Sequence, residues 1–370
     1  MTTVKDVIRL LEQWVPTNLA ESWDNVGLQL GDKQQQVKKI MITLDVIDKV
    51  VDEAIEKNVD LIIAHHPLLF NGLKQIDFQD PKGHVVKKLI QHNISVYTAH
   101  TNLDVVSGGV NDMLAEKLQL KDTKVLVTTE TEQLMKFIVY VPKTHTDKLI
   151  EAIGNAGAGH IGNYSHSTFR SPGTGAFKPL EGTNPYLGRQ GEIEEVEEYK
   201  VETVMKKKQL SQVLAAAQKV HPYEEMAYDI IPLHNKGEKI GLGRIGKLSE
   251  QLKLSEYVEV VKQQLHVPAV RYVGNGDQLI RKVAVLGGSG KGYIKAAQNA
   301  GADLYITGDL TFHEAQDAEE AGLNLIDPGH HVEKIMKEGV QAYFIKNIDA
   351  LPNKVDIVIS ELSTDPFRYQ

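Results

Sequence analysis

The sequence predicts an α/β protein with mainly parallel sheets, flanking helices and an inserted α+β domain of the ferredoxin-like type. Two observations predict this fold. Short apolar segments alternate with helical segments up to residue 128 and again from residue 236, which is the βαβ rhythm of parallel sheets. Between these parts the order changes to β-α-β-β-α-β, the split βαβ pattern. We therefore expect a discontinuous α/β domain of residues 1–128 and 236–370, with residues 129–235 as an inserted domain.

The N-terminal part begins with apolar residues at helical spacing, which predict a helix over residues 4–14 that Pro16 ends. A compact polar turn follows, in which Asp24 and Asn25 fit an Asx turn. Beyond it strands and helices alternate. We expect strands at residues 39–46, 60–64 and 94–98, and helices at residues 49–57, 83–92 and 109–117.

The remaining elements follow from the same periodicities. In the inserted part we expect strands at residues 135–142 and 226–231, and between them a long strand that ends near residue 206. We also expect helices at residues 145–156 and 209–221, and a Gly-, Ser- and Thr-rich segment at residues 157–182. Surface connections at residues 128–131 and 233–238 should join it to the rest. In the C-terminal part we expect strands at residues 283–286, 303–306, 323–326 and 355–359, and helices at residues 257–265, 292–300, 311–321 and up to 337.

The composition is that of a water-soluble globular protein: 370 residues, 42% hydrophobic and 24% charged. The net charge of −8 argues against unspecific binding to nucleic acid or to an anionic membrane. The chain has no cysteine, so any metal must be held by His, Asp and Glu. No signal peptide and no apolar run of membrane-spanning length is present, and we expect a cytoplasmic protein.

A pair of histidines, His65 and His66, follows the expected buried strand at residues 60–64, and Pro67 ends the strand there. Ligands of open α/β sheets collect beyond the carboxyl ends of the strands. Adjacent residues of a strand point to opposite faces, so both imidazoles serve one centre only if the chain turns, or if two centres lie side by side. The alternative is one buried histidine and one solvent-exposed histidine without a metal.

A second pair, His330 and His331, follows a later strand, with Glu333 on the first turn of a helix. His330 and Glu333 are three residues apart and share a helix face, although a carboxylate there also fits a simple charge interaction with the helix N-terminus. Asp104 likewise follows the expected strand at residues 94–98. Three imidazoles and two carboxylates form a donor set that suits Zn, Mn, Fe or Co, as two ions sharing a bridging carboxylate.

Other motifs have weaker chemical implications. The glycine-rich stretch at residues 286–292 follows a strand, but it lacks the spacing of nucleotide-binding loops, and a tight turn is the simpler interpretation. Asp309 and His313 are either supporting partners of a metal site or a helix cap. The segment 221–225, His-Pro-Tyr-Glu-Glu, is interpreted as a structural turn at a helix end, with ligand binding as the alternative. No Gly-x-Ser-x-Gly nucleophile motif is present.

Five motifs together resemble the GTP cyclohydrolase 1 type 2 homologue family, also called the Ngg-interacting-factor-like family. They occur in the same order, at residues 23–28 (Trp-Asp-Asn-Val-Gly-Leu), 64–67 (Ala-His-His-Pro), 100–104 (His-Thr-Asn-Leu-Asp), 307–309 (Thr-Gly-Asp) and 329–331 (Gly-His-His). The resemblance covers about residues 1–128 and 236–370. It implies an α/β unit with a dinuclear metal site and a toroidal homohexamer. The inserted part is similar in pattern to the ferredoxin-like domains of divalent-cation tolerance and nitrogen-regulatory proteins.

Carried over by motif, the resemblance implies that His65, His66, Asp104, His330 and Glu333 are the metal ligands. In many members the Glu lies four residues after the ligand His, whereas Glu333 lies three residues after His330, so His331 remains an alternative to His330.

Two functions follow as hypotheses. The first is hydrolase-type chemistry at two divalent ions, with zinc as the expected metal, Asp104 as the bridging carboxylate and GTP as the substrate that the family name suggests. The second is a non-enzymatic, metal-dependent sensor or partner-binding protein, in which the inserted domain takes a small-molecule ligand and residues 157–182 form a mobile binding loop.

Overall fold

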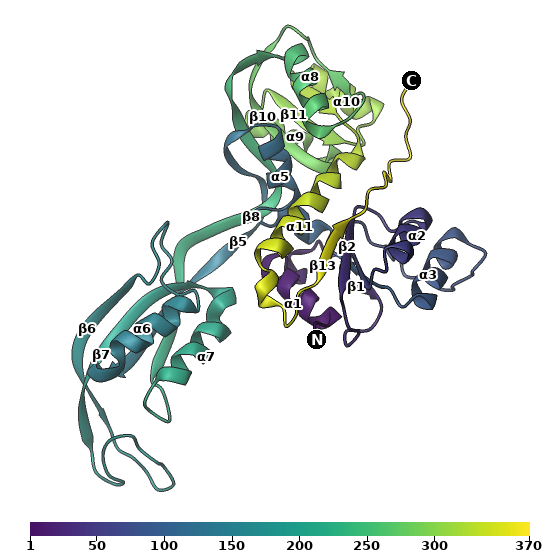
Figure 1. The fold of residues 1–370 in the computed structure, drawn as a ribbon. Coiled ribbons are helices and arrows are strands. Elements are labelled where there is room, and N and C mark those ends of the chain that lie inside the picture. Colours follow the sequence, from purple (N-terminus) through teal and green to yellow (C-terminus); the bar gives the residue numbers. More distant parts are fainter. The chain divides into compact units, whose positions relative to one another are not determined.

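The computed structural model describes the whole chain from Met1 to Gln370 and divides it into two compact units, each described by itself below. The first unit consists of Met1–Thr129 and Ile240–Gln370, and the second of Glu130–Lys239. The fold is mixed α/β, with two sheets and flanking helices (Figure 1), which confirms the predicted fold class. None of the helices is both long and apolar enough to span a lipid bilayer.

The first sheet of the first unit has five strands in the order β1-β4-β3-β2-β13. Neighbouring strands from β4 to β13 run parallel, and only the edge strand β1 pairs antiparallel with β4. The strands are β1 (Gly27–Leu30), β2 (Lys39–Thr43), β3 (Leu61–Ala64), β4 (Ser95–Thr98) and β13 (Asp356–Ile359). Strands β3 and β4 are buried along their full length, and β3 accordingly reads as a short apolar run rather than as an alternating pattern.

The second sheet contributes strands in the order β8-β10-β11-β12-β9 to the first unit. Strands β10, β11 and β12 are parallel, whereas β8 and β9 pair antiparallel with the ends of this group. The strands are β8 (Tyr228–Lys253), β9 (Arg271–Val273), β10 (Leu279–Ser289), β11 (Leu304–Gly308) and β12 (Asn324–Asp327).

Helices cover both faces of each sheet in this unit. One core contains residues of both sheets together with apolar residues of α1, α5, α8 and α11; α5 contacts β10, and α11 contacts β2 and β13. Helices α2 and α3 pack on the other face of the five-stranded sheet, and α9 and α10 on that of the second sheet. The helices are α1 (Val4–Trp14), α2 (Asp48–Glu56), α3 (Pro81–Gln91), α4 (Thr101–Val105), α5 (Val110–Lys117), α8 (Leu254–Leu265), α9 (Ile294–Asn299), α10 (Phe312–Glu320) and α11 (Met336–Lys346), with short 3-10 turns η1 (Thr17–Leu19), η4 (Lys291–Tyr293), η5 (His330–Ile335) and η6 (Ile348–Ala350).

The second unit contains strands in the order β6-β7-β5-β8, with α6 and α7 forming a core against the sheet. Its elements follow the chain as β5 (Lys121–Pro142), η2 (Lys143–His145), α6 (Thr146–Asn155), β6 (Thr168–Phe177), β7 (Glu194–Lys206), η3 (Lys207–Gln209), α7 (Leu210–Val220) and β8. This is the β-α-β-β-α-β order that the sequence predicts.

One expectation for the inserted part is wrong, and another differs in its local structure. The expected connections at residues 128–131 and 233–238 lie largely at the surface and close to the boundaries between the units, but they are parts of the long strands β5 and β8. Part of the glycine-rich segment expected to be a mobile loop is strand β6, which pairs with β7 over its full length. Its Pro172, Gly173 and Gly175 read as loop residues in the sequence, but β6 is an edge strand, where such residues are tolerated.

Candidate metal centre

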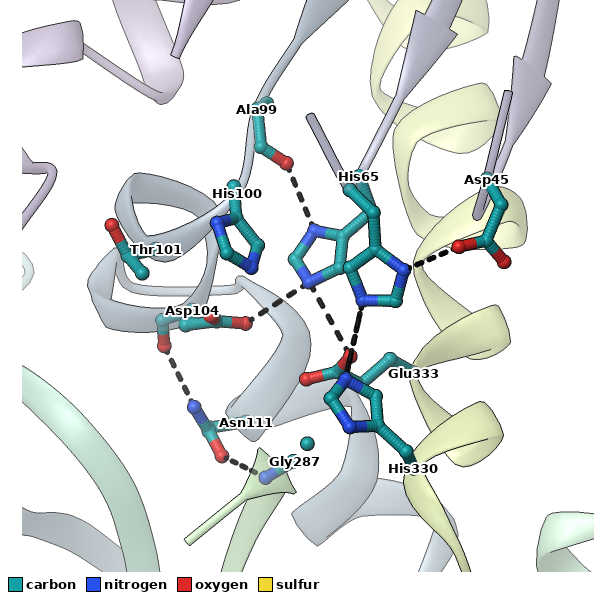
Figure 2. A network of polar contacts seen from close by, with 12 residues as sticks. Asp45, His65, Ala99, His100, Thr101, Asp104, Asn111, Gly287, His330 and Glu333 are labelled. Carbon is teal, nitrogen blue, oxygen red and sulfur yellow. Dashed lines mark hydrogen bonds and ion pairs between the residues drawn. The ribbon is translucent and has the colours of Figure 1, made fainter. Parts of the chain in front are cut away.

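The five predicted metal ligands gather beyond the carboxyl ends of parallel strands in the first unit (Figure 2). His65 and His66 directly follow β3, Asp104 lies on α4 after β4, and His330 and Glu333 lie on η5 after β12. The chain bends directly after β3, and the rings of His65 and His66 lie 5.2 Å apart, both within one cluster of donor atoms. The geometry thus supports the interpretation in which a turn lets both imidazoles serve one centre.

His65 is fully buried, and its two ring nitrogens have different surroundings. Nδ1 lies 2.9 Å from the carbonyl oxygen of Ala99, to which it donates its hydrogen. In the neutral imidazole Nε2 then carries the lone pair, and it has no hydrogen-bond partner. A histidine held in this way presents an unused donor atom to a cation.

His66 and His330 are held by carboxylates at the ends of neighbouring strands. Nδ1 of His66 lies 2.7 Å from Oδ1 of Asp45, and Nδ1 of His330 lies 2.8 Å from Oδ2 of Asp309. Their Nε2 atoms face each other at 3.3 Å. Carboxylate–histidine pairs of this kind orient metal-binding imidazoles and raise their basicity.

Glu333 is the carboxylate that these imidazoles share. Its Oε2 lies 3.0 Å from Nε2 of His66, 3.1 Å from Nε2 of His330 and 3.7 Å from Nε2 of His65. The 3-10 turn η5 has three residues per turn, so His330 and Glu333 stack directly above one another despite their short spacing. A Cβ on Gly288, which has φ +61°, would lie 2.5 Å from Glu333 Oε1, so this glycine leaves room for the carboxylate.

Asp104 faces the same Nε2 atom of His65 as Glu333 does (Figure 2), and its Oδ1 is 3.5 Å from that nitrogen. This oxygen is buried and has no hydrogen-bond partner. Burial raises the pKa of Asp104, and the negative charge of Glu333 adds to the increase, while the nearby His65 opposes it. In this geometry Glu333, rather than Asp104, belongs to two of the three groups of side chains whose donor atoms lie close enough to hold one metal ion together.

His100 is a functional candidate that the sequence reasoning did not include among the ligands. Its Nδ1 lies 2.9 Å from Oδ1 of Asp24, and the backbone N–H of Thr101 donates to Oδ2 of the same carboxylate. Burial opposes these interactions, yet they lower the pKa of Asp24 to about 2. Asp24 therefore does more than form an Asx turn: it orients an imidazole toward His65 and His66.

The structure distinguishes between the two members of the second histidine pair. His330 points into the cluster (Figure 2), whereas His331 belongs to none of the donor groups. Burial lowers the pKa of His331, and Lys334 adds to this effect.

The imidazoles of His66 and His330 compensate the negative charge of the buried Glu333. Burial would lower the pKa of His66, but its hydrogen bonds to Asp45 and Glu333 raise it to about 10. The hydrogen bond to Glu333 raises the pKa of His330 to about 9. Burial of Glu333 is outweighed by its hydrogen bonds to the imidazoles, which hold its pKa well below the usual range. Protons thus occupy the positions between these donors at neutral pH.

Three overlapping groups of donor atoms could each hold a metal ion: His65, Asp104 and Glu333; His66, His330 and Glu333; and His65, His66 and His100. The residues fit such a group on two grounds. The buried Nε2 of His65 and Oδ1 of Asp104 have no hydrogen-bond partner, which is costly unless a cation lies between them. The distances of 3.0–3.7 Å between donor atoms also match the separations of roughly 3–3.5 Å that metal–ligand bonds of about 2.1 Å produce.

The cluster opens into a cavity of about 460 Å³, large enough for a small-molecule ligand. Trp23 and Phe70 line it, and their rings make edge contacts with each other and with His100. The glycine-rich stretch forms another wall, but the N–H groups of Gly287 and Gly290 donate to Asn111 and Thr307 instead of pointing to a ligand. No Lys or Arg lines the cavity.

Comparison with known proteins places the chain in a family. The family model described as Duf34/NIF3 (NGG1p interacting factor 3) matches residues 2–366. The chain belongs to the Duf34/NIF3 family. Two curated relatives, from Bacillus subtilis and Halalkalibacterium halodurans, are 50% and 49% identical; each alignment covers 98% or more of both chains, and both relatives are named GTP cyclohydrolase 1 type 2 homolog. The resemblance stated from the motifs is therefore confirmed.

Solved structures of the NIF3 family share the fold. A Bacillus cereus protein related to NIF3 is 48% identical and superposes with a TM-score of 0.94, covering 100% of this chain and 99% of its own. A Staphylococcus aureus protein is 35% identical with a TM-score of 0.74 over the same shares. The mixed α/β fold with its two sheets is thus the fold of the family.

Proposed function

We propose that this NIF3 family member holds two divalent metal ions in the cluster and uses them for hydrolase-type chemistry on a small molecule. The arrangement of four imidazoles supports this best: each has Nδ1 bonded to an oxygen, and the Nε2 atoms converge beside the open cavity. His65, His66, Asp104, His330 and Glu333 would hold the ions. Zinc, or alternatively Mn, Fe or Co, suits this nitrogen and oxygen donor set. Bound there, the ions would supply Lewis acidity and lower the pKa of water toward about 7.

The chain's own residues would orient the substrate and move the proton. His100 is held by Asp24 at Nδ1 and lines the cavity, so its Nε2 is available to accept a proton. Trp23 and Phe70 provide aromatic surfaces beside it, against which a flat ring can lie. This is the division of roles in a catalytic pair of histidine and aspartate: the carboxylate fixes the tautomer, and the imidazole carries the proton.

GTP is the candidate substrate that the relatives' name suggests. The cavity supports its base better than its triphosphate, because aromatic rings line the walls and no Lys or Arg is present to pair with phosphates. If hydrolysis of a purine-like ring is the function, guanosine should therefore be turned over at a rate comparable to that of GTP.

The test is to incubate zinc- or manganese-loaded protein with GTP or guanosine and to measure formate release and pterin absorbance. Asp104→Asn should abolish turnover, whereas Asp32→Asn, an exposed carboxylate far from the cluster in sequence, should leave it unchanged. The absence of turnover above the Asp104→Asn level for both substrates would refute the cyclohydrolase reaction. The metal site would then be tested separately by elemental analysis.

The alternative function is a non-enzymatic, metal-dependent sensor or partner-binding protein. A metabolite screen by thermal shift distinguishes the two. A compound that stabilises the protein and is recovered unchanged supports sensing, whereas a compound that is consumed supports catalysis.

Three further expectations remain proposals: residues 129–235 as an inserted domain, a cytoplasmic location, and assembly into a toroidal homohexamer, of which the last rests on the family resemblance. Light scattering of the purified protein tests the assembly, and a monomeric or dimeric mass would contradict it.

A further inference from the structure

A second cavity, of about 410 Å³, lies within the second unit and shares no residue with the metal centre. Tyr140 of β5, Phe177 of β6 and Glu198 of β7 form one part of its lining. Tyr223 in the turn after α7 and Tyr186 in the segment between β6 and β7 complete it. The His-Pro-Tyr-Glu-Glu segment, for which the sequence left a structural turn and ligand binding as alternatives, thus lines a cavity with Tyr223, Glu224 and Glu225.

Aromatic rings surround this cavity at steep angles to one another. Tyr223 makes tilted contacts with Phe177 and Tyr186, with ring centroids 5.6 and 6.3 Å apart, and Tyr186 contacts His145 edge-on. The rings therefore do not stack into a closed layer but leave faces and edges on several sides of the space. Such aromatic enclosures attract organic cations through the negative faces of the rings.

Glu198 adds a buried negative charge to the same cavity. It is only 8% exposed, and its Oε1 accepts a hydrogen bond of 2.8 Å from the hydroxyl of Tyr223. No Lys or Arg pairs with it, whereas the next residue back along the strand, Glu197, pairs with Lys143 on the exposed surface. Gly175 leaves room for the carboxylate, because a Cβ there would lie 2.1 Å from Glu198 Oε2.

The rim of this cavity is negatively charged as well. Glu224 and Glu225 line the cavity, and no basic side chain does. Glu224 also accepts a hydrogen bond of 3.1 Å from the backbone N–H of Asn184, which ties the segment between β6 and β7 to the turn. A buried carboxylate without a cationic partner is costly, so a positively charged ligand would stabilise this arrangement.

A metal ion fits this cavity poorly. Nε2 of His221 bonds to the carbonyl of Tyr140, and Nδ1 accepts the backbone N–H of Tyr223, so neither nitrogen is free. The carboxylates of the cavity belong to none of the groups of three closely spaced donor atoms. We propose that the cavity binds a small organic ammonium ion, with its charged group against Glu198 and its apolar part between Phe177, Tyr186 and Tyr223.

Choline and its uncharged isostere neohexanol, in which carbon replaces the quaternary nitrogen, test the charge requirement, and n-butylammonium with n-butanol tests a primary ammonium. Binding to the full-length protein is measured by calorimetry and by saturation-transfer NMR. At least one cation should bind, and its neutral counterpart should bind at least about tenfold more weakly. If neither cation binds, or if each cation and its neutral counterpart bind alike, the proposal is overturned.

Variants locate the bound cation. Glu198→Gln keeps an acceptor for Tyr223 but removes the charge, and should weaken cation binding at least about tenfold. Glu197→Gln, which removes the same charge one residue away, should leave binding unchanged. Equal losses in these two variants would contradict a specific site. If Glu198→Gln does not fold, Tyr186→Leu provides the test, because Tyr186 is half-exposed and its replacement should not prevent folding. This variant should bind the cation more weakly and the neutral isostere equally well. Unchanged cation binding would refute the proposal.

Discussion

Replacing Glu333 should remove both metal ions, whereas replacing Asp104 should remove only one. Glu333 belongs to two of the three donor groups, one with His65 and Asp104 and one with His66 and His330. Asp104 belongs to one of them. The structure therefore predicts metal contents of about two ions per chain for the wild type, about one for Asp104→Asn and close to none for Glu333→Gln.

The stability of the protein should follow the same order. An ion present at about 100 times its dissociation constant stabilises the folded state by about 2.7 kcal/mol. For a unit of this size, that corresponds to a rise in melting temperature of roughly 5–10 °C per ion. Addition of zinc to the chelated protein should therefore raise the melting temperature of the wild type about twice as much as that of Asp104→Asn. For Glu333→Gln the increase should be close to zero.

The measurement is elemental analysis after dialysis at a fixed free zinc concentration, combined with thermal unfolding of each variant with and without chelator. The chelated form of each variant is its own baseline, because Glu333→Gln also removes the charge that compensates His66 and His330. Glu338→Gln, an exposed carboxylate on the following helix, is the matched control and should keep the wild-type metal content. Equal metal contents in Glu333→Gln and Asp104→Asn would refute the shared-carboxylate reasoning.

Three other predictions follow from the same contacts. Asp45→Asn, which weakens the orientation of His66, should lower zinc affinity about 10- to 100-fold in a competition titration, and an unchanged affinity would show that this pair is not needed. Zinc binding near pH 7 should release about two protons, because the pKa values of His66 and His330 without metal are about 10 and 9, and calorimetry in buffers of different ionisation enthalpy counts these protons. The protonated histidines stabilise the chelated form fully below pH ~6.5, and this stabilisation is lost as pH rises through their pKa values, whereas zinc is lost below pH ~6. The difference in melting temperature between the zinc-loaded and chelated forms should therefore grow from pH 6 to 9. Arg244→Leu should cost about 3 kcal/mol in urea unfolding, because Arg244 is 4% exposed and bonds to both oxygens of Asp112; a loss no larger than that of the exposed Arg9→Leu control would contradict this.

Much of the fold could be predicted because each strand of the parallel groups is short, buried and bounded by polar residues. The strand before His65 and His66 is one example, since all four of its residues are buried and it reads as an uninterrupted apolar run. The long strands β5 and β8 could not be predicted in the same way. Their middle parts are exposed and rich in charged and polar residues, so pairing with neighbours, rather than local composition, makes them strands.

The proposed ligands could be chosen from sequence because chemistry collects at strand ends, but their supporting partners could not. Asp24 contacts His100 across 76 residues, and no local pattern joins them. The bridging role assigned to Asp104 rested on its charge alone. The structure places Glu333 within 3.7 Å of His65, His66 and His330, whereas Asp104 approaches only His65. Glu333 reaches His330 because η5 is a 3-10 turn, and the sequence does not distinguish such a turn from an α-helix.

One signal in the sequence could have identified two of these partners: an internal repeat. Asp45 and His66 are 21 residues apart, as are Asp309 and His330, and His66 and His330 are separated by 264 residues. The same offset relates helix α2 to helix α10, and each helix connects a strand that the aspartate follows to a strand that the histidine follows. Each half thus supplies one strand–Asp–helix–strand–His unit, and the Nε2 atoms of the two histidines, His66 and His330, face each other at 3.3 Å.

His65, Asp104 and Glu333 have no counterparts in such a unit, and Glu333, from one half alone, contacts the imidazoles of both. The repeat therefore explains the paired imidazoles, and the departure from it explains why a single carboxylate can join the two proposed metal positions.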